Sequence, residues 1–102
     1  GIHPDESVPG YRHIYIDPQI PHGVTWAKIT KECPYGTIGV NWKLEDGQLY
    51  LQLAIPAGTT ATVCIPDNAV SCKINNKKMG IQKKTIVVDR GNYDFVFDLY
   101  PY

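Results

Sequence analysis

Apolar and polar residues alternate along two neighbouring stretches of the chain, residues 37–44 and 48–55. A period of two is typical of a β-strand that buries one face and exposes the other. The apolar positions of these two stretches are Ile38, Val40, Trp42, Leu44, Leu49, Leu51, Leu53 and Ile55. Each set falls on one side of its strand, so both strands are predicted to contribute to the same hydrophobic core.

Turn residues separate these strands from each other and from the next. Asp46-Gly47 joins the first two strands, and a type I′ hairpin turn requires the positive φ angles that Asp and Gly tolerate. Pro56-Ala57-Gly58 forms the next corner, before another apolar run that ends at Ile65. The region from Tyr35 to Pro66 is therefore predicted to form three consecutive strands.

The same signals recur along the rest of the chain and predict eight short strands. These are Arg12–Asp17, Val24–Lys31, Thr37–Leu44, Gln48–Ile55, Thr60–Ile65, Ser71–Ile74, Thr85–Val88 and Tyr93–Leu99. No stretch has the pattern of a helix. Regular spacing with Pro and Gly in the corners indicates an all-β protein, an antiparallel β-sandwich with Greek-key-like connections.

A length of 102 residues corresponds to one domain. Residues 1–10 contain two prolines and are interpreted as a lead-in segment from a preceding domain, and residues 11–102 as a single β-sandwich domain. A core of this size leaves little volume for a deep catalytic cavity, so any site should be shallow or shared with another domain.

The charges balance, with ten Lys plus Arg against ten Asp plus Glu. There is no general field to attract nucleic acid or anionic lipid, so neither is expected as a partner. No apolar run approaches the length of a membrane helix, and we expect a soluble protein. Half of the positive charges lie between Lys73 and Lys84, either as a solvated hairpin surface or as a weak anion site.

Three cysteines are present, Cys33, Cys64 and Cys72. Their spacing does not suggest a zinc site. Cys64 lies in an apolar run and is predicted to be buried as a small hydrophobic residue, although a Cys64–Cys72 bridge across a turn is an alternative in an oxidising compartment.

Groups for catalysis are sparse, and we assign no catalytic, cofactor-binding or metal-binding residue. His3, His13 and His22 lack metal-ligand spacing. The carboxylates are scattered through turns, whereas a glycosidase needs two that face each other across a cleft. Neither Ser7 nor Ser71 has the flanking glycines of a hydrolase nucleophile.

The aromatic residues are more informative. Trp42 is in phase with the apolar positions of its strand, so it is predicted to lie in the core. The residues in phase with Trp26 on its strand are Val24, which is apolar, and Lys28, which is charged. Trp26 is therefore predicted to lie in the core, at an interface, or on the surface as a platform for a sugar ring. His13 shares a strand face with two tyrosines. Together with Trp26, the candidate carbohydrate or domain-docking residues are Tyr11, His13, Tyr15 and Tyr35.

A succession of short motifs then resembles a known family. They are Pro9-Gly10-Tyr11-Arg12-His13-Ile14, Asp17-Pro18, Val24-Thr25-Trp26-Ala27-Lys28, Pro34-Tyr35-Gly36-Thr37-Ile38, Asn41-Trp42-Lys43, Ile55-Pro56-Ala57-Gly58-Thr59-Thr60-Ala61 and Thr62-Val63-Cys64-Ile65-Pro66. In this order they resemble the C-terminal β-sandwich domain of bacterial α-L-rhamnosidases. The resemblance covers about two thirds of the chain.

The resemblance implies a parent enzyme that is an inverting glycoside hydrolase, with its acid and base on a preceding (α/α)6 barrel. No catalytic residue is carried over to this chain, which is expected to be inactive alone. Its expected role is an accessory domain that packs on the barrel and stabilises it. The alternative is a carbohydrate-binding module that presents rhamnose-containing carbohydrate, with Trp26 and Tyr35 as stacking residues. The implied source is bacterial, with the compartment open between periplasm or exterior and cytoplasm.

Overall fold

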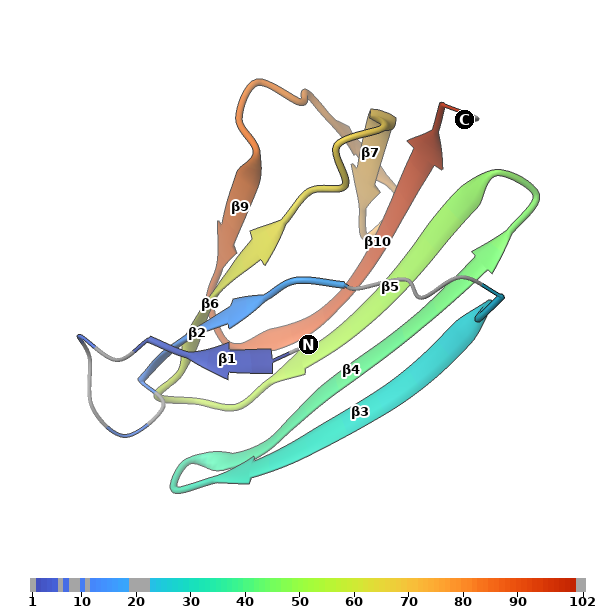
Figure 1. Cartoon of the computed structure of the whole chain (residues 1–102). Helices are drawn as coiled ribbons and strands as arrows, with labels where there is room; N and C mark the ends of the chain where they lie inside the picture. The colour runs from blue at the N-terminus through green and yellow to red at the C-terminus, as the bar shows by residue number, and fades with distance from the viewer. Residues whose placement is uncertain (1, 6, 8–9, 11, 19–22, 101–102) are drawn as a thin grey trace.

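A computed structural model describes residues 2–5, 7, 10, 12–18 and 23–100, and all regular structure in these ranges is β (Figure 1). The strands are β1 (Ile2–Pro4), β2 (His13–Ile16), β3 (Trp26–Cys33), β4 (Gly36–Glu45), β5 (Gln48–Ile55), β6 (Thr60–Cys64), β7 (Ala69–Ile74), β8 (Lys77–Met79), β9 (Thr85–Val88) and β10 (Gly91–Leu99). All eight predicted strands are present, with ends that differ by up to two residues.

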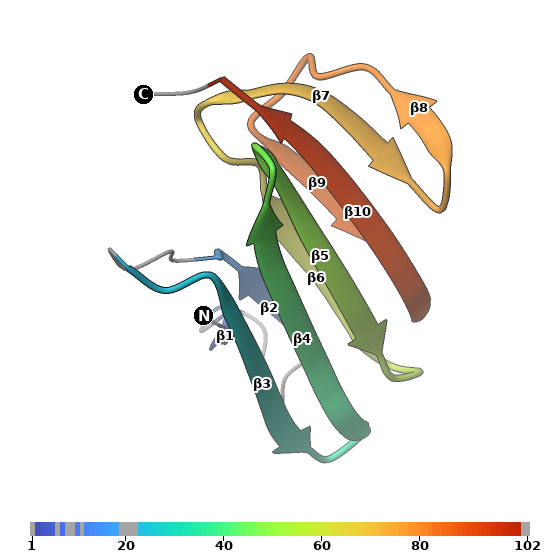
Figure 2. The ribbon, with the colours of Figure 1, turned by 90° about the vertical axis from the view of Figure 1, so that its right-hand side faces the viewer.

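The strands form two sheets that pack face to face. The smaller sheet has the order β1-β2-β6-β9, and the larger has the order β3-β4-β5-β10-β7-β8. Figure 2 shows the two sheets as successive layers, with β1 and β3 on the same side of the molecule. Along the sequence the chain crosses from one sheet to the other more than once. In the larger sheet, β10 lies between β5 and β7. The prediction of an all-β, antiparallel β-sandwich is confirmed.

The core lies between the two sheets and is filled by the alternating apolar positions. Trp42 is only 4% exposed, which confirms its predicted place in the core. Phe95 and Phe97 on β10 are fully buried, and their ring centroids lie 5.8 Å apart in a stacked arrangement. The smaller sheet contributes Ile14, Ile16, Ala61, Val63 and Val88.

The hairpin turns follow the local sequence. Asp46 and Gly47 have φ angles of 53° and 75°, so both central residues of this turn are left-handed, as type I′ requires. Asn75 and Asn76 have φ angles of 50° and 67° in the two-residue turn between β7 and β8. Asn is among the few non-glycine residues that adopt this region readily.

Two strands were not predicted. β1 lies in the lead-in segment and pairs antiparallel with β2, so that this segment contributes to the sandwich. β8 lies in the lysine-rich run and forms an edge of the larger sheet. Both are only three residues long, too short to show a period. Lysines on an edge strand disfavour pairing with another molecule. Whether a further domain precedes residues 1–10 stays a prediction.

The pairing of β2 with β6 is parallel and is the exception in this antiparallel-rich sandwich. All other pairings among the described strands are antiparallel. Alternation within a strand does not specify the direction of its partner. Parallel strands need a long crossover connection, and three strands of the other sheet separate β2 from β6 along the chain.

The Cys64–Cys72 bridge considered from the sequence does not form, because all three cysteines are free thiols. Cys64 ends β6 in the smaller sheet, whereas Cys72 is on β7 in the larger sheet. Burial raises the pKa of both thiols. Cys72 is fully buried and Cys64 is only half-buried. No helix in the described ranges is long and apolar enough to cross a membrane.

The stacked pair on β10 leads to a stability prediction. Phe95→Ala should lower the free energy of unfolding by about 3–5 kcal/mol, because a large side chain is removed from a fully packed site. Urea denaturation followed by tryptophan fluorescence measures this loss. Val70→Ala on β7 is the control: Val70 is 62% exposed, so its truncation should cost no more than about 0.5 kcal/mol. Similar losses in the two variants would contradict the assigned core.

Candidate functional site

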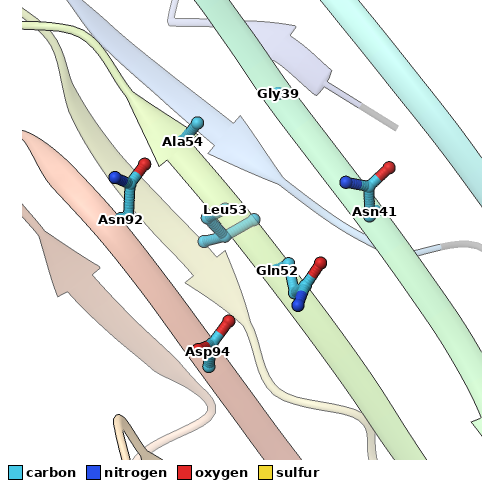
Figure 3. Close-up of a pocket in the computed structure, with 7 residues that line it drawn as sticks. All are labelled: Gly39, Asn41, Gln52, Leu53, Ala54, Asn92 and Asp94. Carbon is cyan, nitrogen blue, oxygen red and sulfur yellow. The ribbon is translucent and has the colours of Figure 1, made fainter.

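The outer face of the larger sheet carries a group of polar side chains on its central strands. The register places Asn41 of β4, Gln52 of β5 and Asp94 of β10 in one row across the sheet. In the next row Asn92 lies beyond Ala54 and Gly39 (Figure 3). We call the hollow between these residues the amide groove.

The amide groove has a volume of about 250 Å³ and is open to solvent. It exists because its floor is made of small residues. A Cβ atom added at Gly39 would lie 3.5 Å from the Cβ of Ala54, in ordinary contact, so the absent side chain at residue 39 leaves this space. Larger residues at either floor position would fill the hollow.

The side chains of the amide groove make no hydrogen bond within the described part of the chain. Three amides and one carboxylate therefore offer donors and acceptors to solvent, or to a ligand in the hollow, rather than to one another. The backbone N–H of Asp94 is held separately, since it donates to the Oδ1 of Asn75 at 2.8 Å.

A second polar cluster on the same sheet face is bonded internally. The Oγ of Ser71 and the Nε2 of Gln48 each donate to Asp98 at 2.5 Å. Tyr50 Oη donates to Gln48 Oε1 at 2.6 Å. These bonds lower the pKa of Asp98, with the bond from Ser71 as the largest cause and the bond from Gln48 next. This cluster stabilises the sheet and leaves few groups for a ligand.

Trp26 begins β3, an edge strand of the larger sheet, and is 68% exposed. It is not in the core, which removes one of the three interpretations considered from the sequence. Its partner across the sheet is Lys43. The Nζ of Lys43 lies 3.1 Å from a carboxylate oxygen of Glu45 and 5.2 Å from the centroid of the Tyr50 ring. Trp26 itself remains available for a partner or a ligand.

Tyr35 lies in the turn between β3 and β4 and is 42% exposed. Its ring packs on the Pro56-Ala57-Gly58 corner, where a Cβ at Gly58 would lie 2.6 Å from Tyr35 Cδ1. Tyr35 and Trp26 are therefore at opposite ends of β3, separated by more than about 20 Å at roughly 3.3 Å per residue. The two proposed stacking residues cannot contact the same sugar ring.

His13 and Tyr15 come together on the outer face of the smaller sheet. Their rings meet edge to face with centroids 5.4 Å apart. The Nδ1 of His13 lies 2.5 Å from Thr60 Oγ1, and its Nε2 lies 2.7 Å from Thr62 Oγ1. Both ring nitrogens are thus engaged by threonines on β6, an arrangement that suits a structural role. Tyr11, the remaining candidate, and His22 lie outside the described residues.

A larger hollow of about 420 Å³ lies at the end of β6. Asp17, Asp67 and Lys84 line it. Pro18 and Cys64 also line this hollow. No group of three or more His, Cys, Asp or Glu residues that could hold a metal ion occurs in the described ranges.

Sequence reasoning did not find the amide groove. Its polar residues occupy outward positions of alternating strands, which a pattern analysis treats as solvated. Gln52 and Asp94 are neighbours only through the register of β5 with β10, strands that are distant in the sequence. A signal was present in the small residues Gly39 and Ala54 at outward positions, but only the pairing shows that they adjoin.

Fold and surface together define a small β-sandwich domain whose polar groups line open hollows. The family model described as "Bacterial alpha-L-rhamnosidase C-terminal domain" matches residues 1–80. The chain belongs to this family, and the resemblance found in the sequence is confirmed. The match ends before β9 and β10, so it does not include Asn92 and Asp94.

Curated relatives carry the same family name. Two proteins from Formosa agariphila, each called "Alpha-L-rhamnosidase", are 25% identical over 96% of this chain and 32% identical over 93% of it. The chain spans only 11% of the length of each.

Solved structures show the same fold. The α-L-rhamnosidase from Dictyoglumus thermophilum matches 86% of this chain with a TM-score of 0.77 and 17% identity. The Streptomyces avermitilis α-L-rhamnosidase, complexed with L-rhamnose, matches 85% with a TM-score of 0.70 and 27% identity. The Aspergillus terreus enzyme matches 93% with a TM-score of 0.71 and 25% identity. This chain covers 9–11% of those chains.

The contact of Tyr35 with Gly58 gives a coupled prediction. Gly58→Ala should destabilise the chain by at least about 1 kcal/mol, because φ at Gly58 is 93° and the new methyl group would overlap the tyrosine ring. In a Tyr35→Ala background the same change should cost less, with a coupling of about 1–2 kcal/mol. Gly39→Ala, at an ordinary φ, is the matched control and should be nearly neutral. Strict additivity in urea denaturation would rule out the contact.

The internally bonded cluster predicts a pH dependence. The folded-state pKa of Asp98 is lowered, so its stabilising contribution is present above the unfolded pKa and is lost as pH falls through the folded pKa. Ser71→Ala should raise the folded pKa of Asp98 towards 3.8, observed by NMR titration of its side-chain carboxyl carbon. The variant should lose stability relative to wild type at pH 7, and this difference should shrink at pH 2. An unchanged titration would show that the Ser71 bond does not form.

Proposed function

We propose that this chain is a non-catalytic accessory domain that packs against the catalytic domain of an α-L-rhamnosidase and stabilises it. The observation that carries the proposal is the size of the chain relative to its relatives: it spans 11% of proteins called "Alpha-L-rhamnosidase". The remaining length of such a parent would contain the catalytic domain, which the family resemblance gives as an (α/α)6 barrel with the acid and base. The isolated chain is accordingly expected to be inactive.

The way the chain enters the domain supports a close association. β1 is hydrogen-bonded to β2, and the backbone N–H of Asp5 donates to the carbonyl of His13 at 3.0 Å. The chain therefore joins the sandwich as a paired strand. A preceding domain connected through this strand would be held close to the β1 side, because a paired strand lacks the freedom of a flexible linker.

The β1 side also carries the most exposed aromatic residue described. β3 is the edge of the larger sheet on the same side of the sandwich as β1 (Figure 2), and Trp26 stands at its start. Tryptophan is enriched at interfaces because it combines a large apolar surface with a polar N–H. Covering β3 would also protect an edge strand with unpaired backbone groups. Trp26 is therefore our candidate anchor for the catalytic domain.

Removal of residues 2–102 from the parent enzyme should lower its melting temperature and its yield of folded protein, because an apolar surface of the catalytic domain would become exposed. Differential scanning calorimetry of the full-length and truncated enzymes measures this. An unchanged melting temperature after truncation would refute the stabilising role.

A point variant tests the proposed anchor. In the parent, Trp26→Ala should destabilise the association by about 2 kcal/mol, as expected for a tryptophan at an interface hot spot. In the isolated chain the same change should cost no more than about 0.5 kcal/mol, because the side chain is already exposed. Val70→Ala, near the opposite edge of the same sheet and similarly exposed, is the matched control. If Trp26→Ala destabilised the parent and the isolated chain by the same free energy, Trp26 would not be part of the interface.

The second candidate function is carbohydrate binding. Trp26 and Tyr35 do not support it as a pair, because they lie at opposite ends of β3. The observation that favours it is the amide groove, whose hydrogen-bonding side chains are not engaged by other described residues.

A further inference from the structure

We infer that the amide groove is a binding site for a single neutral sugar ring, held through a pair of neighbouring hydroxyl groups. The side chains that would hold it are Asn41, Gln52, Asn92 and Asp94, above the floor of Gly39 and Ala54 (Figure 3). This inference does not depend on packing against a catalytic domain, since it concerns a hollow within the described chain.

The chemistry of the groove selects hydroxyl groups. Each amide offers N–H donors and a carbonyl acceptor, and the Asp94 carboxylate offers acceptors only. A hydroxyl is both a donor and an acceptor, so neighbouring hydroxyls can satisfy an amide and a carboxylate at once. An anion would be repelled by Asp94, and a metal ion would find a single carboxylate here, since no group of three or more His, Cys, Asp or Glu residues that could hold a metal occurs in the described ranges. A neutral polyhydroxyl ligand fits these charges best.

The shape of the groove limits the ligand to one ring. Its volume of about 250 Å³ is below the range of about 300–1,000 Å³ that is typical of sites for drug-sized ligands. The methyl group of Ala54 and the backbone of Gly39 provide a small apolar floor for the C–H face of a ring. Because the site is open, we expect a millimolar dissociation constant.

The residues of the groove are positioned by rigid elements. They lie on β4, β5 and β10, and each of these strands has hydrogen-bonded neighbours on both sides. The bond from Asp94 N–H to Asn75 further ties this part of β10 to the β7–β8 turn. The backbone that carries these side chains is therefore held in place before a ligand binds.

The neighbouring cluster shows that polar groups on this face can satisfy one another. Gln48, Ser71 and Asp98 do so at short distances. Gln48 lies four residues from Gln52 along β5, Asp98 lies four residues from Asp94 along β10, and Ser71 is on the neighbouring strand β7. In the amide groove the corresponding groups surround a hollow instead. This difference between two polar clusters on one sheet face is the observation that points to a ligand.

The test is an NMR titration of the isotope-labelled 102-residue chain with L-rhamnose, D-glucose and cyclohexanol. The backbone amides of residues 39–41, 52–54 and 92–94 and the side-chain amides of Asn41, Gln52 and Asn92 are followed. We expect saturable shifts at these signals with at least one of the two sugars at millimolar concentrations. Cyclohexanol, which has one hydroxyl group, should cause none. Inorganic phosphate is the anionic probe and should also leave these signals unchanged.

Two kinds of variant test the assignment. Gly39→Val should fill the floor and abolish the shifts, while Gln52→Ala should remove one amide and weaken binding by about tenfold. Both are at outward positions, and the amide spectrum reports whether each variant remains folded. Lys78→Gln, on the outer face at β8, is the control and should bind as wild type does.

The inference is overturned if no sugar shifts the groove signals at about 0.1 M, a concentration that would saturate a millimolar site. It is equally overturned if the shifts persist in both Gly39→Val and Gln52→Ala, or if they centre on Trp26 or on the hollow beside Asp17. Failure here would leave the packing proposal untouched, because that proposal is measured in the parent enzyme by its melting temperature.

Discussion

The pairing of β5 with β10 is the contact on which both faces of this domain depend. It joins strands that are about forty residues apart in the sequence and aligns Leu51 with Phe95 and Leu49 with Phe97 on the inner side. The same register places Gln52 beside Asp94 on the outer side. A slip of one residue would send the phenylalanines to solvent and the carboxylate into the core. Burial of the two rings therefore also specifies which polar groups line the amide groove.

The two proposed surfaces place different demands on the fold. The proposed packing on a catalytic domain would use the side of the sandwich where β1 and β3 lie, and where the larger sheet has an unprotected edge. The opposite edge, β8, carries lysines and has little need of cover. The amide groove instead lies on central strands. A domain can therefore cover the β3 edge while the groove stays accessible, so that one small sandwich could serve as a support and as a ligand site.

Prediction succeeded where the determining interaction is local. Alternation in residues 37–55 gave the strands, their buried faces and the place of Trp42, and Asp46-Gly47 gave the turn. Prediction failed for β1 and β8, because three residues are too few to show a period and each strand forms only by pairing with its neighbour in the sheet. It also missed the half-exposure of Cys64, because an apolar run of three residues at the end of a strand does not show how far the opposite sheet extends. The parallel orientation of β2 and β6 could not be predicted from the residues of either strand.

The sequence by itself determined the class of the fold, most strand positions and the turn conformations, because these depend on the period of side chains along a strand and on the φ angles that particular residues tolerate. It also carried enough ordered motifs to indicate the family. Only the tertiary structure decided which strands are neighbours, which tryptophan is exposed, and which polar residues converge. Those outcomes depend on contacts between distant segments, where the burial of one face selects the register and the register then sets the neighbours on the other face.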